Sequence, residues 1–82
     1  MSSSEHHDGR PLHRLVVDAL EPGLGVLVID AEGGIVGRCA DDQSQLELNL
    51  PRGLYTVRSN RSGSFAETVV RLDGTQTVKA PV

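Results

Sequence analysis

Aromatic side chains are scarce in this sequence of 82 residues: Tyr55 and Phe65 are the only two, and tryptophan is absent. A carbohydrate-binding module stacks sugar rings on several aromatic side chains, so this scarcity counts against that class of function. Cysteine is almost as rare, because Cys39 is the single one and has no partner for a disulfide within the chain. Small secreted domains usually depend on such cross-links, so we expect a reducing compartment, the cytoplasm.

Basic residues are outnumbered by acidic ones, with eight Lys and Arg against 11 Asp and Glu and a formal net charge of −3. Proteins that bind nucleic acids normally carry a basic patch and an excess of positive charge. Nucleic acid is therefore not expected as a partner.

Long hydrophobic runs are also missing. The longest, Val26–Ile29, is far shorter than the roughly 20 residues that a membrane-spanning helix needs. Residues 1–10 are polar and lack the apolar core of a signal peptide. We expect no contact with a membrane, a flexible tail at residues 1–11 and one folded domain at residues 12–82.

Turn-forming pairs of residues divide the rest of the chain at short, regular intervals, which is typical of all-β proteins. The runs between the turns have the length of strands and are rich in Val, Leu, Ile and Thr. The first run is ambiguous, because its apolar residues are also spaced like one face of a helix, but the β-branched pair Val16–Val17 favours a strand. The pattern predicts about seven strands, at residues 12–19, 25–30, 35–40, 45–50, 54–60, 65–72 and 75–80.

Alternation of apolar and polar residues indicates which side chains face the core. Leu46, Leu48 and Leu50 alternate with polar residues, so the leucines are expected to face inward. Tyr55 and Val57 share one face in the same way. The short connections imply mostly antiparallel pairing, and an antiparallel sheet with one apolar face needs a second layer to cover it. We therefore expect an all-β fold, a small antiparallel sandwich of two sheets.

The stretch from Leu48 to Val57 reads Leu-x-Leu-Pro-x-Gly-x-Tyr-x-Val. In this motif the proline presets the turn, Gly53 allows a backbone conformation that other residues resist, and Tyr55 brings a large ring whose hydroxyl can bond a backbone group. With the glycine turns on either side, the chain from Val26 onward resembles the prealbumin-like sandwich families: carboxypeptidase regulatory-like domains, collagen-adhesin B-type repeats and PEGA domains. The resemblance implies an accessory, spacer or binding module attached to a larger assembly.

Enzymatic chemistry is not expected. Transthyretin-like hydroxyisourate hydrolases share the broad prealbumin-like fold, but their Tyr-Arg-Gly-Ser sequence is absent here and their paired catalytic histidines have no counterpart. Cys39 is interpreted as a small buried thiol and not as a nucleophile, because no histidine of the folded core sequence accompanies it.

Two groups of residues contain side chains of the kinds that bind metal ions. His6, His7 and His13 lie in or beside the expected tail and have no further ligand at a suitable spacing. The acidic residues Asp41–Asp42 and Glu47 lack the alternating oxygen ligands and the turn glycine of a calcium loop. We expect no metal and no other cofactor.

The candidate partner-binding residues are Arg58, Arg61, Phe65 and Arg71. Arginine recognises carboxylates through two parallel hydrogen bonds, although solvated arginines that protect a strand edge are an alternative. Phe65 is exposed if the opposite face of its strand turns inward, and it then suits a contact with a partner. The alternative is that Phe65 caps the end of the sandwich.

Taken together, these residues predict a non-catalytic module that binds a protein partner through a sheet edge or through the hairpin at residues 58–65. Two other functions stay open. One is a carbohydrate-binding module, and the other is the protomer of a homo-oligomer in which strand edges pair with copies of themselves.

Overall fold

The computed structural model describes residues 11–20, 24–39, 42–61 and 63–81, except for the side chain of Arg61. These residues form seven strands and no helix, which confirms the predicted all-β class. Each strand matches one predicted run, with ends displaced by at most two residues. The strands are β1 (Leu12–Asp18), β2 (Gly25–Ile29), β3 (Ile35–Arg38), β4 (Gln45–Pro51), β5 (Gly53–Arg61), β6 (Ser64–Leu72) and β7 (Gln76–Lys79).

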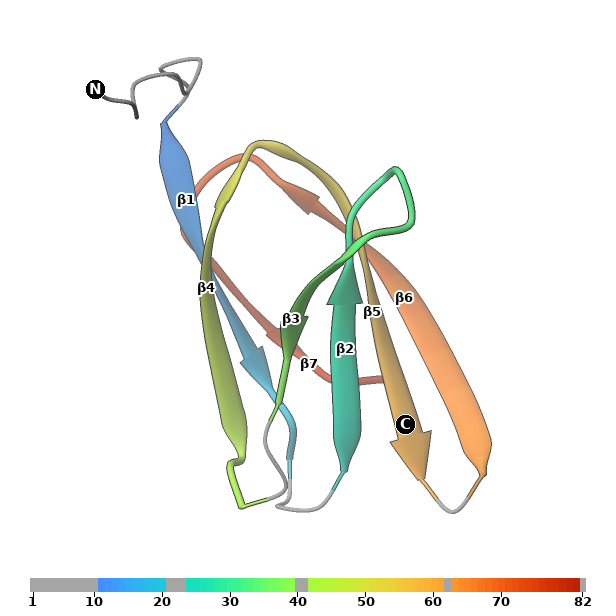
Figure 1. Ribbon diagram of the computed structural model, residues 1–82. Coiled ribbons are helices and arrows are strands. Elements are labelled where there is room, and N and C mark those ends of the chain that lie inside the picture. Colours follow the sequence, from blue (N-terminus) through green and yellow to red (C-terminus); the bar gives the residue numbers. More distant parts are fainter. Residues whose placement is uncertain (1–10, 21–23, 40–41, 62, 82) are drawn as a thin grey trace, which may run out of the picture.

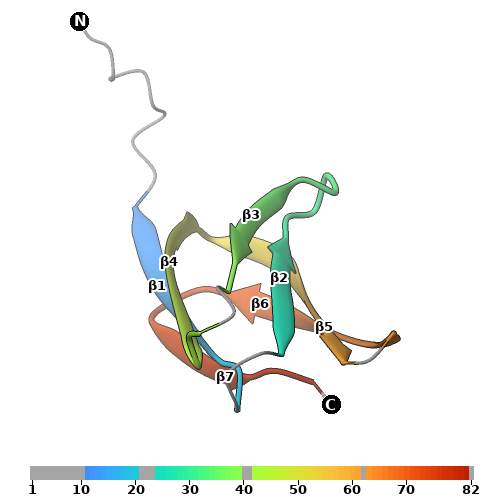
Figure 2. The ribbon, with the colours of Figure 1, turned by 60° about the horizontal axis from the view of Figure 1, so that its bottom comes forward.

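The strands form two packed sheets, as Figures 1 and 2 show. One has three strands in the order β4-β1-β7, and the other has four strands in the order β3-β2-β5-β6. Neighbouring strands are antiparallel except β1 and β7, which run in the same direction with Leu15 opposite Gln76. The predicted two-sheet sandwich is therefore confirmed, while the parallel pair was not predicted.

The first run of the chain forms a strand, as its β-branched residues favour, and the helical alternative is wrong. Burial alternates along β1, with Leu15 and Val17 completely buried and Arg14 exposed. Every residue of β1 pairs with β4, from Leu12 opposite Pro51 onward. The local sequence of this run is compatible with a helix or a strand. Hydrogen bonding to β4 along the whole length of β1 favours the strand.

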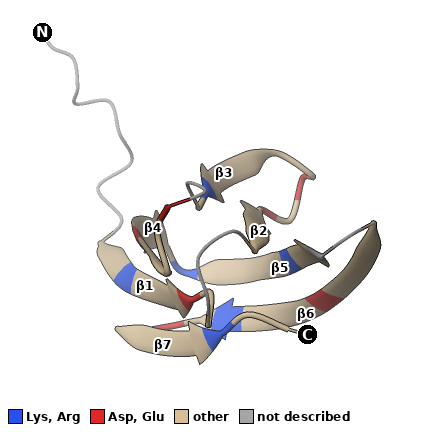
Figure 3. Ribbon diagram, turned by 90° about the horizontal axis from the view of Figure 1, so that it is seen from below, with Lys and Arg blue, Asp and Glu red and all other residues tan. Residues whose placement is uncertain are grey.

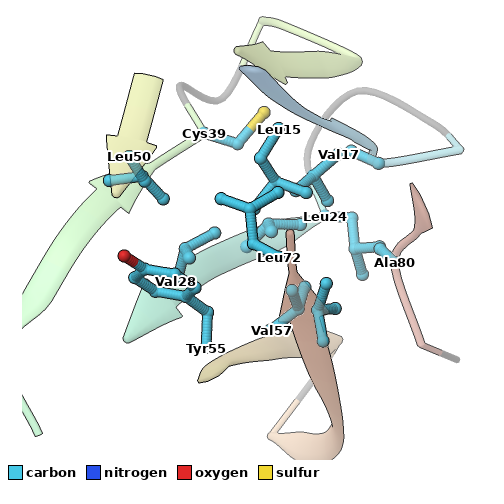
Figure 4. Close-up of a cluster of buried hydrophobic side chains, with 13 residues drawn as sticks. Leu15, Val17, Leu24, Val28, Cys39, Leu50, Tyr55, Val57, Leu72 and Ala80 are labelled. Atoms are coloured by element: carbon cyan, nitrogen blue, oxygen red, sulfur yellow. The ribbon is translucent and has the colours of Figure 1, made fainter. Parts of the chain in front are cut away.

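The hydrophobic core lies between the two sheets and receives side chains from both. Leu50 is buried in it, and the two other leucines of β4 are half-buried and pack against it, as their alternation predicted. Figure 4 shows side chains from both sheets pointing into this common interior, among them Leu15, Val28, Val57 and Leu72.

The two sheets approach each other most closely where β3 passes β4. Gly37 of β3 lies against Leu48 of β4, and a Cβ atom added to Gly37 would stand 2.5 Å from Leu48 Cδ1. Any larger residue at this position would push the leucine aside. The glycine thus permits the close approach that joins the two layers on this side.

The turn between β4 and β5 contains the Leu-Pro motif. β4 ends at Pro51 and β5 begins at Gly53, whose φ is 158°. The Tyr55 ring is buried, and its hydroxyl donates a hydrogen bond of 2.6 Å to the carbonyl oxygen of Pro51. The predicted role of Tyr55 as a buried ring that bonds a nearby backbone group is confirmed.

The C-terminal segment is attached to both sheets. The amide of Ala80 donates a hydrogen bond of 2.7 Å to the carbonyl oxygen of Asp18, the last residue of β1. The buried hydroxyl of Ser59 in β5 donates to the carbonyl oxygen of Pro81. At the other end of the chain, the predicted tail lies outside the described residues apart from Pro11, which is exposed and precedes β1.

Candidate protein-binding surface

The four-stranded sheet covers the core with one face and turns the other to solvent. Ile35, Leu54, Phe65 and Val69 all lie on the solvent side, with exposed fractions of 56%, 53%, 67% and 66%. Side chains alternate between the two faces of a strand, so the buried residues of each strand identify the outward-pointing ones. The outer face of the sheet carries the side chains of Leu27, Ile29, Ile35, Arg38, Leu54, Thr56, Arg58, Asn60, Phe65, Glu67, Val69 and Arg71.

Strand register aligns much of the apolar surface into one row. Ile35 is opposite Ile29, Ile29 is opposite Thr56, and Thr56 is opposite Val69. Directly opposed side chains on one face lie within contact distance of each other, about 5 Å between Cβ atoms. The row therefore crosses all four strands of the sheet without a charged residue, and three of its four members are aliphatic, Thr56 being the exception; we call it the aliphatic row.

One end of the outer face carries a cluster of three interacting side chains. Arg58 Nε donates to Glu67 Oε2 at 2.5 Å, and these two residues are directly opposed in β5 and β6. The guanidinium carbon of Arg58 also lies 5.8 Å from the centre of the Phe65 ring, a cation–π contact. The ion pair is half exposed and adds little stability. Its effect is to hold the arginine beside an exposed aromatic ring.

The structure brings together two of the four predicted partner-binding residues. Arg58 and Phe65 lie in the cluster, and the predicted exposure of Phe65 is confirmed. Arg71 is exposed on the same face but lies opposite Leu54, at the other end of β6. Arg61 belongs to β5, and its side chain lies outside the described residues. A role of these residues in binding stays a prediction.

Sequence reasoning did not single out the aliphatic part of the outer face as a surface. The alternation along residues 65–72 puts Val69 on the same face as Phe65, but Ile35 and Val36 are adjacent apolar residues, and the pattern does not show which of these two points outward. Leu54 is adjacent to Tyr55, so here too two apolar residues follow each other and their directions are not obvious from the sequence. Counting from Tyr55, which the alternation turns inward, places its neighbour Leu54 on the outside.

A shallow hollow of about 320 Å³ lies at one end of the sandwich, beside the β2–β3 and β4–β5 turns. The polar side-chain atoms beside it form hydrogen bonds within these two turns. Asp30 Oδ1 accepts hydrogen bonds from the amides of Glu32 at 3.0 Å and Gly34 at 2.7 Å. On the other side the Tyr55 hydroxyl donates to Pro51. These hydrogen bonds stabilise the two turns, so the polar groups beside the hollow have a structural role.

Cys39 is 5% exposed, and its thiol donates to the Gln43 carbonyl oxygen at 3.4 Å. Burial raises the pKa of the Cys39 thiol above its ordinary value, and the negative charge of Asp42 raises it further. The thiolate is the reactive form of cysteine, so both effects lower its nucleophilicity at neutral pH. The interpretation of Cys39 as a small buried thiol is confirmed.

Of the two groups that were not expected to bind a metal, only part lies within the described residues. His6, His7 and Asp41 lie outside the described residues, while Glu47 pairs with Arg14 at 2.5 Å. Within residues 11–20, 24–39, 42–61 and 63–81, no group of three or more His, Cys, Asp or Glu is placed to hold a metal ion. The same residues contain no helix that is long and apolar enough to cross a membrane.

Charged residues of both signs are spread over the strands of both sheets (Figure 3). The outer face follows this distribution, because it carries the positive Arg38, Arg58 and Arg71 together with the negative Glu67, which pairs with Arg58. The face is thus an aliphatic row with charges of both signs beside it.

Comparisons with known proteins gave no match: none was found among models of protein families, among curated proteins or among solved structures. The class shown is a small β-sandwich of two sheets. The resemblance of the Leu48–Val57 motif to prealbumin-like domains stays a prediction.

Proposed function

We propose that this protein is a non-catalytic module that binds another protein through the outer face of its four-stranded sheet. The observation that carries the proposal is the aliphatic row that crosses the sheet, with Ile35 and Val69 both more than half exposed at its ends. Contiguous exposed apolar patches on soluble domains commonly mark sites of interaction.

Protein-binding surfaces combine an apolar centre with a polar rim, and the outer face has both parts. Complete burial of a Val, Leu, Ile or Phe side chain contributes about 1.5–3 kcal/mol, so covering even part of this row supplies useful binding free energy. The rim includes Arg58, an arginine already held in place by Glu67 and packed beside Phe65. Arginine and large apolar side chains fixed in advance lose little conformational freedom when they bind.

The resemblance to prealbumin-like modules supports the same use, because those modules serve as accessory parts of larger assemblies. On this view the protein is an adaptor. The single buried thiol of Cys39 agrees with a reducing compartment, and we place the module in the cytoplasm.

The test compares Ile35→Lys with Leu12→Lys. Both residues are exposed aliphatic side chains, at 56% and 61%, but Leu12 belongs to the other sheet. The full chain serves as bait in lysate, and each captured protein is then purified and its affinity measured by calorimetry. We expect Ile35→Lys to weaken binding at least about tenfold, which corresponds to about 1.4 kcal/mol, and Leu12→Lys to leave it unchanged. Phe65→Ala should weaken it as well.

A purified partner that binds Ile35→Lys and Phe65→Ala as tightly as the wild type would refute docking through the outer face. Equal weakening by Leu12→Lys and Ile35→Lys would refute it too, since the effect would then be one of charge alone.

A further inference from the structure

β6 is the longest strand at a sheet edge, with nine residues against seven in β4 and four each in β3 and β7. Among the described residues it pairs only with β5, and in Figure 1 it forms the outer boundary of the four-stranded sheet. Edge strands are normally protected from pairing by short length, by proline, by charged side chains such as lysine, or by a bulge. The other edges show these features, namely the register shift in β3, Pro51 in β4 and Lys79 in β7. β6 has no bulge, proline or lysine, and its two charged residues, Glu67 and Arg71, have opposite signs, so they can pair with a second copy of the strand and need not repel it.

The backbone groups left free on β6 follow from the strand register. Val26 of β2 turns its carbonyl toward β3, where it accepts a hydrogen bond of 3.0 Å from Cys39. Backbone groups alternate in direction along a strand, so the neighbouring residues of β2 bond β5 instead. The same alternation applies to β5, where every second residue bonds β2 and the residues between them bond β6. In β6 the residues that bond β5 therefore alternate with residues whose amide and carbonyl groups point away from the sheet. These residues are Phe65, Glu67, Val69 and Arg71.

The side chains of the same residues lie on the outer face, and their charges are self-complementary. In an antiparallel pair of two β6 strands with Val69 at the centre, Glu67 stands directly opposite Arg71 of the second copy. Symmetry repeats the pair, so Arg71 stands opposite Glu67 of the second copy. Moving the centre by one residue would lose both pairs, which makes this register the favoured one.

We propose that two copies of this chain associate through their β6 strands, antiparallel and centred on Val69. The two four-stranded sheets then join into one continuous sheet across a two-fold axis. The free groups of Glu67, Val69 and Arg71 form about six backbone hydrogen bonds between the copies.

Side-chain rows of the outer face continue across this junction. Arg58, Glu67 and Arg71 of the second copy follow each other in one row, so the carboxylate lies between two guanidinium groups. In the central row Val69 meets Val69 of the second copy, and each valine loses much of its 66% exposure. The dimer leaves the outer face open and doubles its area. The inference therefore goes beyond the proposed function and does not depend on it.

An interface made by one strand from each copy is small, because stable specific interfaces bury about 1,600 Å² in total. We therefore expect a reversible dimer whose population rises with concentration. Sedimentation equilibrium of the full chain should show an average mass that rises from that of one chain toward that of two as the concentration increases.

Charge reversal tests the register. Arg71→Glu places acidic residues opposite each other, and Glu67→Arg places basic residues opposite each other, so each variant alone should remain monomeric. A mixture of the two variants restores opposite charges across the junction and should form the mixed dimer. Arg14→Glu is the matched control, because Arg14 also belongs to an exposed ion pair but lies on β1, and it should dimerise like the wild type. Far-UV circular dichroism and thermal unfolding confirm that each variant is folded.

Amide hydrogen exchange provides a second measurement that separates edge pairing from stacking of the outer faces. The amides of Glu67, Val69 and Arg71 should become protected as the wild-type concentration rises, and they should remain unprotected in Arg71→Glu. The Thr68 amide bonds β5 in the monomer and should be protected throughout.

Three results would overturn the proposal. One is a wild-type mass of a single chain up to millimolar concentration. Another is dimerisation without protection of the Glu67, Val69 and Arg71 amides. The third is a mixture of the two charge-reversal variants, both folded, that stays monomeric.

Discussion

Replacing Tyr55 by phenylalanine should remove one hydrogen bond and leave the packing of the ring intact. The hydroxyl of Tyr55 donates to Pro51 at 2.6 Å, and only 6% of the residue is exposed. Loss of such a bond leaves a partly buried carbonyl without its partner, which costs about 1.5 kcal/mol. Domains of this size lose roughly 4–8 °C in Tm for each kcal/mol, so Tm should fall by about 6–12 °C.

Urea and thermal unfolding of the wild type, Tyr55→Phe and Tyr55→Ala measure this effect. Tyr55→Ala also removes the buried ring and should cost about 3–5 kcal/mol. Leu54→Ala is the control, because this exposed neighbour lies outside the core and should change the free energy of unfolding by no more than about 0.5 kcal/mol. A Tyr55→Phe variant as stable as this control would show that the bond to Pro51 does not hold the β4–β5 turn.

Three further predictions concern backbone strain, close packing and the buried thiol. Leu20 has a φ of 73° and is exposed, so Leu20→Gly should raise the free energy of unfolding by about 0.5–1 kcal/mol in urea titrations, whereas Leu20→Ala should give no gain. Gly37→Val should destabilise by about 1–3 kcal/mol because its Cβ would press on Leu48, and the double variant with Leu48→Ala should lose less than the sum of the two single variants. The pKa of Cys39 is raised by folding, so its stabilising effect is complete below the ordinary thiol pKa of about 8.5 and is lost as the pH rises toward the higher pKa of the folded state. Unfolding measured from pH 7 to pH 10 should therefore show a steeper loss of stability for the wild type than for Cys39→Ala, and equal slopes would contradict this reasoning.

The sequence predicted features that depend on neighbouring residues. The alternation of leucines with polar residues correctly predicted that Leu50 faces the core. The Pro-x-Gly-x-Tyr spacing correctly predicted the buried ring of Tyr55. The pattern also allowed an exposed Phe65, and the structure shows this ring on the outer face. In each case a two-residue period or a turn residue carries the information locally.

Features that depend on distant residues were not predicted. Nothing near Leu15 indicates that β1 pairs in parallel with β7, because Gln76 lies almost at the other end of the chain. The aliphatic row has the same origin, since Ile35 and Val69 become neighbours in one row only through the register of two intervening strands. Pairing of strands sets such contacts, and a one-residue shift would turn every side chain to the other face.

The parallel pairing of β1 and β7 also determines how the domain would respond to mechanical load. Because both strands run in the same direction, the start of β1 and the end of β7 lie at opposite ends of their sheet (Figure 1). A pull on the residues that flank these two strands would draw them past each other along their length. Such a shearing load is shared by all the hydrogen bonds of the pair at once, whereas a hairpin pulled at its open ends breaks them one after another. The β1–β7 pair is therefore expected to resist such a pull better than a hairpin of the same length.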